Sequence, residues 1–217
     1  WRSLGTGEIW IYHVTGGKGV PLVERRSQTL QKELGEPIFS ADGKALYYSE
    51  NVTPGDLFVY AQDSNKQTFQ IKRYDMATGE TSAAVSGNGG AVRATPSPDG
   101  RYIAFVRRLR ERSALYLKDL ASSELTLLNA DLDRDMQETW ATEGVYPNMD
   151  WTPDSRSIVY WAGGKILRLR VADKSIEEIP FRVWQTHIVN ELARLKVDLT
   201  PESFDTRMHR WASASPD

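Results

Sequence analysis

The sequence contains no cysteine, which excludes disulfide bonds and thiolate metal sites but leaves the cellular compartment open. Histidine is scarce, with three residues in 217, and no two of them form an H-x-H pair. The motifs H-E-x-x-H and G-x-S-x-G are also missing, so the common signatures of metallohydrolases and serine hydrolases are absent. We therefore expect the chain to hold no catalytic residue and no cofactor. His13 is expected in a strand, and His187 and His209 on the surface.

Long hydrophobic runs are also missing, so no segment is expected to insert into a membrane. The sequence shows no signal-peptide pattern at its start. The formal net charge is −2, which gives no reason to expect nucleic acid as a partner. Because the chain opens on Trp1 without methionine and stops inside a repeated motif, we expect it to be a fragment of a longer protein.

One short motif returns along the chain at nearly constant spacing. Its copies are Ser40-Ala41-Asp42-Gly43, Ser97-Pro98-Asp99-Gly100, Thr152-Pro153-Asp154-Ser155 and Ser215-Pro216-Asp217. The aspartates of successive copies are 57, 55 and 63 residues apart. A period of this length indicates a repeat architecture, in which one supersecondary unit cannot bury its apolar face alone.

The motif has the chemistry of a tight turn. Proline presets φ, aspartate bonds the backbone two residues on, and glycine adopts the positive φ that closes a hairpin. Branched and aromatic residues on both sides make each copy the bend of a β-hairpin. The third copy has Ser155 in place of Gly43 and Gly100. A positive φ costs a non-glycine residue about 1 kcal/mol, so we predict another turn type there.

Strand-like runs around each motif repeat in groups of four, as in residues 94–96, 102–106, 115–119 and 125–128. This pattern predicts an all-β chain, a partial β-propeller built from four-stranded antiparallel blades, with a plain β-sandwich as the alternative. A further hairpin is predicted around Leu57-Phe58-Val59-Tyr60. The predicted units are a partial blade (1–34), three blades (35–92, 93–147, 148–182), a helical or extended insertion (183–210) and the start of another blade (211–217).

The motif and the later Asp75-Met76-Ala77-Thr78-Gly79-Glu80 resemble TolB-type propeller repeats. Residues 130–217 are more particularly similar to the propeller that precedes bacterial amidohydrolase domains. The segments that carry this resemblance are Asp133-Arg134-Asp135-Met136-Gln137-Glu138, Gly144-Val145-Tyr146-Pro147, Trp151-Thr152-Pro153-Asp154 and 210–217.

The resemblance implies a non-catalytic module of a larger periplasmic or exported hydrolase, acting as a scaffold, a partner surface or a substrate gate. Its partner would be the rest of the parent chain or another protein. Two alternatives remain open: a stand-alone TolB-like binding protein of the cell envelope, and the propeller filter of a serine peptidase. Open blade edges also predict self-association, with residues 1–34 and 200–217 the least stable parts.

Two charged clusters are candidates for binding. Asp131, Asp133, Asp135 and Glu138 alternate like the start of a calcium loop. Because Arg134 and Met136 stand where such a loop bends on glycine, an acidic surface loop is the preferred interpretation. The resemblance makes this loop the first choice for a functional surface.

The second cluster is basic and consists of Arg107, Arg108, Arg110 and Arg112. An anionic polymer is a possible ligand, but Glu111 interrupts the cluster and the chain is acidic overall. A solvated hairpin tip or a contact with an acidic neighbour is therefore preferred. The glycine-rich segment 87–90 lacks the lysine of a phosphate-binding loop and is predicted to be a flexible connection between blades.

Overall fold

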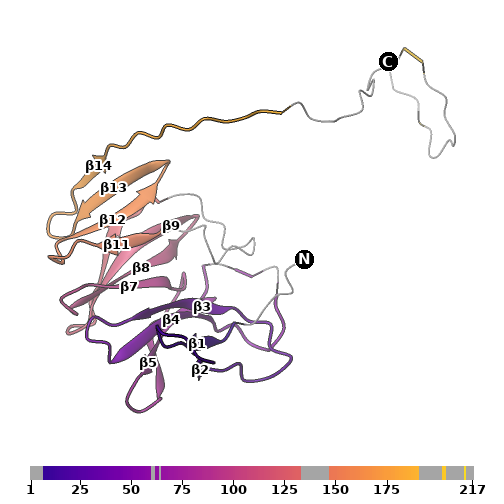
Figure 1. Ribbon diagram of the computed structural model, residues 1–217, viewed down its shortest axis with the longest axis vertical. Coiled ribbons are helices and arrows are strands. Elements are labelled where there is room, and N and C mark those ends of the chain that lie inside the picture. The colour runs from indigo at the N-terminus through magenta and orange to yellow at the C-terminus, as the bar shows by residue number, and fades with distance from the viewer. Residues whose placement is uncertain are drawn as a thin grey trace. The chain divides into compact units, whose positions relative to one another are not determined.

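The computed structural model describes residues 7–59, 62–63, 65–132, 147–190, 202–203 and 213 (Figure 1). The chain divides into two compact units, residues 1–181 and 182–217. The strands that the structure describes belong to the first unit. The described residues of the second unit, which include part of the predicted insertion, form neither helix nor strand. Within the described ranges no helix is suited to cross a membrane.

The first unit begins with a two-stranded antiparallel sheet, β1 (Ile9–Ile11) and β2 (Val20–Val23). The next sheet has four strands in chain order, and each pairs antiparallel with its neighbour. Its strands are β3 (Leu34–Phe39), β4 (Ala45–Asn51), β5 (Phe69–Asp75) and β6 (Thr81–Val85).

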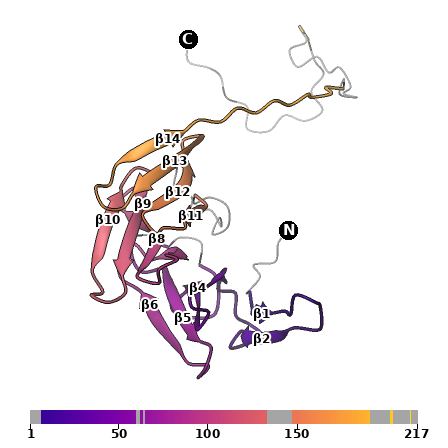
Figure 2. The ribbon, with the colours of Figure 1, turned by 60° about the vertical axis from the view of Figure 1, so that its left-hand side comes forward.

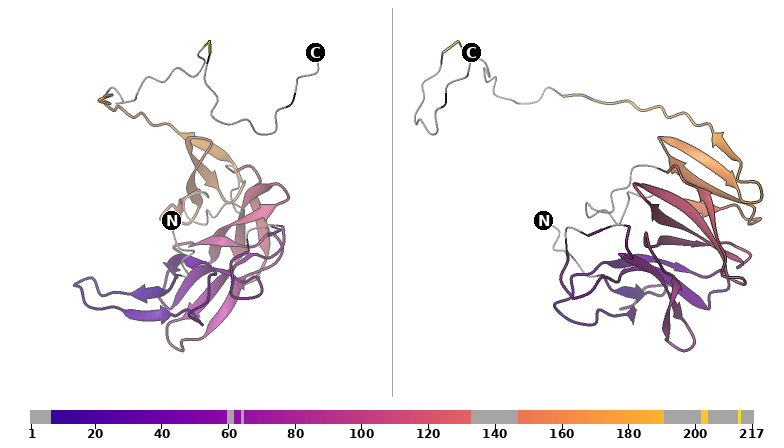
Figure 3. Two further views of the ribbon diagram at one scale, coloured as in Figure 1. Left: turned by 90° about the vertical axis from the view of Figure 1, so that its right-hand side faces the viewer. Right: turned by 180° about the vertical axis from the view of Figure 1, so that it is seen from behind.

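Two more four-stranded antiparallel sheets follow with the same strand order (Figure 3). The second contains β7 (Val92–Pro96), β8 (Tyr102–Leu109), β9 (Arg112–Asp119) and β10 (Leu125–Asn129). The third contains β11 (Met149–Trp151), β12 (Ser157–Ala162), β13 (Lys165–Arg170) and β14 (Ile176–Ile179). The predicted fold class is confirmed.

Some details differ from the prediction. β3 and β7 each begin one residue before the predicted blade boundary, because Leu34 pairs with Glu50 and Val92 pairs with Val106 in the ladders. The predicted hairpin around residues 57–60 is wrong for its described part, because residues 57–59 form no strand.

The three motif turns share one geometry. In each, the backbone N–H of the fourth residue donates to the carbonyl of the first over 2.9 Å, from Gly43 to Ser40, Gly100 to Ser97 and Ser155 to Thr152. The φ angles of the three donors are 69°, 72° and 58°. The predicted change of turn type in the third copy is therefore wrong: Ser155 adopts the left-handed conformation of the two glycines.

The core lies between successive sheets, which follow one another in chain order in Figure 2. Tyr47 and Ile71 of the first sheet pack with Ile103 and Phe105 of the second. A larger cluster joins the second and third sheets. Its buried members are Ala104, Leu115, Leu117, Leu128, Trp151, Ile158, Tyr160, Ala162 and Leu169. In these clusters each sheet buries its apolar side chains against a neighbouring sheet, which is the physical basis of the repeat.

The antiparallel order gives each sheet two distinct ends. We call the end with the motif turns at Asp42, Asp99 and Asp154 the turn end. The opposite end, which we call the loop end, holds the β8–β9 turn at Arg110 and the connection from β6 to β7. First strands of successive sheets contact one another, since β7 lies against both β3 and β11.

Candidate functional site: a polar row near the loop end

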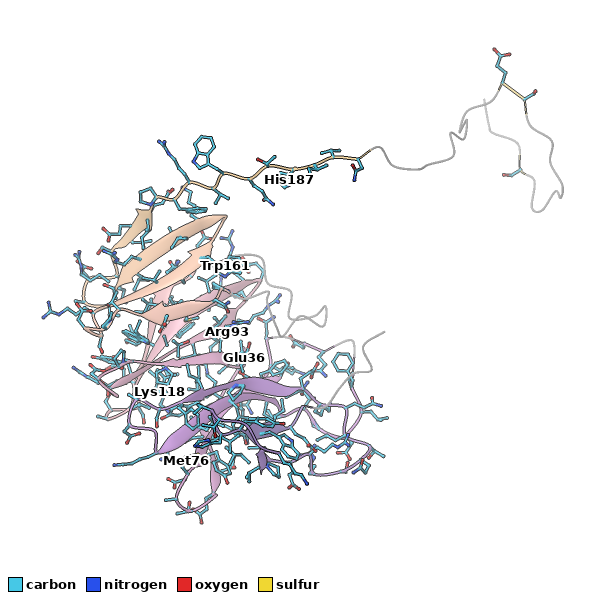
Figure 4. All side chains as sticks on the ribbon, in the orientation of Figure 1. Glu36, Met76, Arg93, Lys118, Trp161 and His187 are labelled. Carbon is cyan, nitrogen blue, oxygen red and sulfur yellow. The ribbon has the colours of Figure 1, made fainter. Side chains whose placement is uncertain are left out.

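Three polar residues occupy equivalent places before or within the first strands of successive sheets. Glu36, Arg93 and Asn148 each stand six residues before the aspartate of their motif turn. Since each first strand runs from the loop end to the turn end, this position lies toward the loop end. We call these three residues the inner polar row; Figure 4 labels Glu36 and Arg93.

The row is joined from sheet to sheet by charged contacts. The Arg93 Nε atom lies 3.3 Å from Glu36 Oε1, and the two side chains are only 17% and 14% exposed. Glu36 Oε2 accepts hydrogen bonds from Ser49 Oγ at 2.8 Å and from the Arg93 backbone N–H at 2.9 Å. The Arg93 guanidinium also donates to Asn148 Oδ1. A carboxylate and a guanidinium thus neutralise each other where both are largely buried.

The backbone at the row is irregular in the same way in two sheets. Glu36 and Arg93 have φ angles of 56° and 58°, in the left-handed region. Both lie where the register shifts, between Gly35 and Ile38 in β3 and between Val92 and Thr95 in β7. A bulge of this kind turns a side chain away from the regular alternation. The cost of two non-glycine residues at positive φ is offset by the contacts that the row makes.

The predicted basic cluster is divided by the fold. Arg107 is not a solvated tip, because its guanidinium donates to the carbonyls of Gly90 at 2.8 Å and Ser86 at 2.6 Å. It also lies over the rings of Phe105 and Tyr116. Burial lowers the pKa of this guanidinium. Arg107 therefore fastens the connection between two sheets.

The rest of that cluster lies at the loop end. Arg110 is exposed at the turn between β8 and β9, with a φ of 57°. Arg108 Nε donates to the Arg110 carbonyl at 2.7 Å, and Arg112 pairs with Asp131 at 2.7 Å. Asp131, the first residue of the predicted acidic loop, is thus an ion-pair partner of the basic cluster. Asp133, Asp135 and Glu138 lie outside the described residues.

The glycine-rich segment is better fastened than predicted. Gly89 donates its N–H to the Asn65 carbonyl at 2.8 Å and accepts from the Arg108 N–H at 2.9 Å, while Gly87 donates to Gln67 Oε1. A Cβ atom at Gly89 would lie 2.2 Å from the Arg108 carbonyl oxygen. The segment connects two sheets. Close packing against β8 explains Gly89, and a positive φ angle explains the glycines at 87, 89 and 90.

One polar group near the loop end was missed by sequence reasoning. Lys32 is buried, and its Nζ donates to Thr53 Oγ1 at 2.6 Å. Thr53 Oγ1 in turn donates to Asn51 Oδ1, and Asn51 Nδ2 donates to Glu33 Oε2 at 2.8 Å. Burial lowers the pKa of Lys32, while the charge of Glu33 acts against this shift. No sequence motif marks this chain of bonds, because its members meet only through the fold.

The histidines form no site in the described part of the chain. His13 is not in a strand as predicted: it follows β1, is exposed and bonds Thr15 Oγ1 at 2.7 Å. His187 is exposed, and His209 lies outside the described residues. Among the residues that the structure describes, no group of three His, Cys, Asp or Glu side chains is placed to hold a metal ion.

The predicted turn residues lie at the turn end, away from the inner polar row, except Asp217, which is outside the described residues. In each turn the aspartate accepts a hydrogen bond from the first residue of the motif, from Ser40 at 2.7 Å, Ser97, or Thr152 at 2.6 Å. These hydroxyl bonds are the main reason why the pKa values of Asp42, Asp99 and Asp154 are lowered.

No protein-family model matches the sequence, and no curated protein matches it. Solved structures are similar in fold. TolB from Acinetobacter baumannii has a TM-score of 0.62 and 18% identity, over 81% of this chain and 38% of that one. A protein assigned as TolB from Agrobacterium tumefaciens has a TM-score of 0.55 and 16% identity, over 82% of this chain and 57% of that one. The tricorn protease has a TM-score of 0.53 and 14% identity, over 80% of this chain and 19% of that one.

This chain therefore spans less than two thirds of each of these three proteins. At such low identity the likeness concerns the fold. The described sheets form part of a TolB-like β-propeller.

Proposed function

We propose that this chain is a non-catalytic, TolB-like propeller module of a larger exported hydrolase of the amidohydrolase type. The loop end is the surface through which the module meets the rest of that protein. The resemblance of residues 130–217 supports the amidohydrolase context and the export, and the fold likeness supports the propeller module.

The observation that carries the proposal is the contrast between the two ends. At the turn end the same hydrogen-bonded turn occurs three times. The loop end differs from sheet to sheet: it carries the Arg112–Asp131 pair, the exposed Arg110 and the buried Lys32. Binding residues concentrate on variable loops held by a rigid scaffold, so the loop end is the better candidate for contact with a partner.

The chemistry of the loop end favours binding. Charges of both signs occur there, and the Arg112 and Asp131 side chains are 61% and 79% exposed. An exposed pair of this kind contributes little to stability, so its groups can exchange partners at small cost. The surface fits a polar, charged segment of a neighbouring domain.

The complete reading frame that encodes the chain tests the hydrolase context. We expect further blades and then a domain with an H-x-H pair, preceded by an export signal. A G-x-S-x-G motif after the propeller would instead support a serine peptidase. A propeller with no enzyme domain would support a stand-alone binding protein. Either result would overturn the amidohydrolase proposal.

Photo-crosslinking in the full-length protein tests the binding surface. A photoreactive amino acid at Glu111, exposed beside Arg110, should crosslink to a segment outside the propeller. The matched control is the same amino acid at Lys44 in a motif turn, where the side chain is 81% exposed. Equal crosslinking from both positions, or none from Glu111, would contradict the assignment of the loop end.

A further inference from the structure

A pocket of about 450 Å³ lies at the turn end, between the first and second sheets. It is separate from the inner polar row and does not depend on the proposed function. The first sheet lines it with Asp42, Tyr47 and Arg73, among others, and the second sheet contributes Pro96 and Asp99. Its volume falls in the range of small-molecule sites in proteins.

The next interface along the chain shows what fills the equivalent place. Between the second and third sheets, Tyr102 stacks on Trp151 with ring centroids 6.3 Å apart and planes 12° from parallel. Ser155 Oγ accepts a hydrogen bond from the Asp99 backbone N–H at 3.0 Å. An aromatic pair and one hydroxyl therefore close the second interface.

The first interface has smaller residues at all three of these positions. Counted from the motif aspartates, Ala45 stands for Tyr102, Pro96 for Trp151 and Gly100 for Ser155. A Cβ atom at Gly100 would meet nothing within 4 Å. Two other positions have larger residues in the first interface. Tyr47 and Arg73 stand where the second interface has Ala104 and Leu117, so their side chains fill part of the space. The pocket remains, and these two residues give it a phenol ring and a guanidinium.

The polar walls favour a cation over an anion. Asp42 and Asp99 each use Oδ1 for bonds within their own turns, and among the described residues Oδ2 of neither accepts a hydrogen bond. Asp42 Oδ2 lies 3.8 Å from Lys44 Nζ, but both side chains of this pair are exposed, so a bound ammonium can take the place of Lys44 at small cost. Both carboxylates have lowered pKa values, chiefly through the hydroxyl bonds from Ser40 and Ser97, so both are ionised at neutral pH. The guanidinium of Arg73 is already paired with Asp75 at 3.0 Å.

We propose that this pocket binds a compact aromatic group with an ammonium end. The ring takes the place that Trp151 fills in the second interface, against Pro96 and Tyr47, and the ammonium faces Asp42 and Asp99. The same chemistry is offered by a free aromatic amine and by an aromatic side chain next to a lysine in a polypeptide.

The test follows the backbone amide signals of Asp42 and Gly100 by NMR in the full chain. Tyramine is the free probe, 4-ethylphenol is its neutral analogue, and acetyl-Ala-Tyr-Lys-Ala-amide is the peptide probe. We expect tyramine to shift both signals, with an affinity at least five-fold higher than that of 4-ethylphenol. The peptide distinguishes the two sources of the ligand. If the peptide binds more tightly than tyramine, the natural ligand is a polypeptide, and if it binds more weakly, the ligand is a free amine.

Two variants close the pocket in different ways. Gly100→Ser introduces the hydroxyl that closes the second interface, at a φ of 72° close to the 58° at which Ser155 stands. Leu120→Trp fills the pocket from a 36% exposed position just after β9, and it leaves the motif turns unchanged. Each should weaken tyramine binding at least five-fold. The matched control is Gly43→Ser, because Gly43 has the same turn conformation and does not line the pocket.

Three results would overturn the proposal. The first is that tyramine leaves the signals of Asp42 and Gly100 unchanged. The second is that Gly100→Ser and Gly43→Ser, both folded by circular dichroism, bind tyramine equally, with Leu120→Trp also without effect. The third is that 4-ethylphenol binds as tightly as tyramine, which would remove the role of the two carboxylates.

Discussion

The hydroxyl of Ser155 accepts a hydrogen bond from the backbone N–H of Asp99 over 3.0 Å, and so ties the motif turn of the third sheet to that of the second. Ser155 stands where two other copies of the motif have glycine, and it keeps their left-handed backbone conformation. The backbone of Ser155 is therefore strained, but its hydroxyl makes a hydrogen bond between sheets that glycine, which has no side chain, cannot make.

Substitution of Ser155 separates the strain from the bond. Ser155→Ala keeps the positive φ and loses the hydroxyl, so we expect a loss of about 1 kcal/mol in the free energy of unfolding. Ser155→Gly also loses the bond but relieves about 1 kcal/mol of strain, so its stability should stay close to that of the parent chain. Urea unfolding of both variants measures the difference. An alanine variant as stable as the parent would show that the bond contributes nothing.

The ion pair between Glu36 and Arg93 should contribute strongly to the interface of the first two sheets. Both side chains are largely buried, so removing one partner leaves the other charge uncompensated. We expect Glu36→Ala or Arg93→Ala each to cost roughly 2–4 kcal/mol of unfolding free energy.

A double-mutant cycle isolates the pair from the other contacts of the two residues. The variant with both substitutions should lose less than the sum of the single losses, by at least about 1 kcal/mol. Arg112→Ala and Asp131→Ala provide the matched control, because that pair is exposed and should show almost no coupling. Additive losses at Glu36 and Arg93 would contradict the prediction.

Stability should fall in acid because several turn aspartates have lowered pKa values. At Asp173, hydrogen bonds from the Ser175 hydroxyl and N–H, and one from Arg170, lower the pKa to about 2. A carboxyl with a lowered pKa stabilises the fold above its unfolded-state pKa of about 4, and this contribution disappears as the pH falls through the folded value.

The stability of Asp173→Asn should therefore depend less on pH than that of the parent chain between pH 4 and pH 2. Urea unfolding across this interval measures the slope. Asp150→Asn serves as a control, because Asp150 is an aspartate of strand β11 that lies outside the turns and accepts a hydrogen bond from the Trp151 backbone N–H. An identical slope for Asp173→Asn and the parent would argue against the lowered pKa.

Trp161 marks an apolar face on the third sheet that should promote association. Trp161, labelled in Figure 4, is 37% exposed. It pairs with Ile166 in the ladder of β12 and β13. The equivalent residues of the second sheet, Val106 and Leu115, are 1% and 0% exposed. A partly exposed apolar face favours contact with a further blade, a partner or a second copy.

We expect the chain on its own to self-associate, and Trp161→Lys to reduce this association. Multi-angle light scattering over a concentration series measures the mass. Val183→Lys, an exposed apolar position outside the sheets, tests whether any added charge has the same effect. A parent chain that stays monomeric, or an equal effect of both variants, would contradict the role of this face.

Local chemistry in the sequence was sufficient to predict the fold. The returning turn motif and the branched residues around Tyr102–Val106 specify a hairpin wherever they occur, because turn conformation and strand preference depend on residues close in the chain. The nearly constant period then predicts equal units that need one another for burial. The sequence alone shows that an acidic segment begins at Asp131, but it does not show that Asp131 pairs with Arg112.

The tertiary structure alone decided the contacts between sheets. Glu36 contacts Arg93, which is 57 residues away in the sequence, and Asp99 contacts Ser155, which is 56 residues away. Turn and strand preferences act between near neighbours in the chain, so they cannot predict contacts at such separations. Arg107 belongs by sequence to a basic cluster, yet it binds two carbonyls of the β6–β7 connection. The sequence determined by itself which units form, because turns and strands depend on neighbours in the chain. The packing of neighbouring sheets decides which residues pair, which pocket stays open and which serine has a strained backbone.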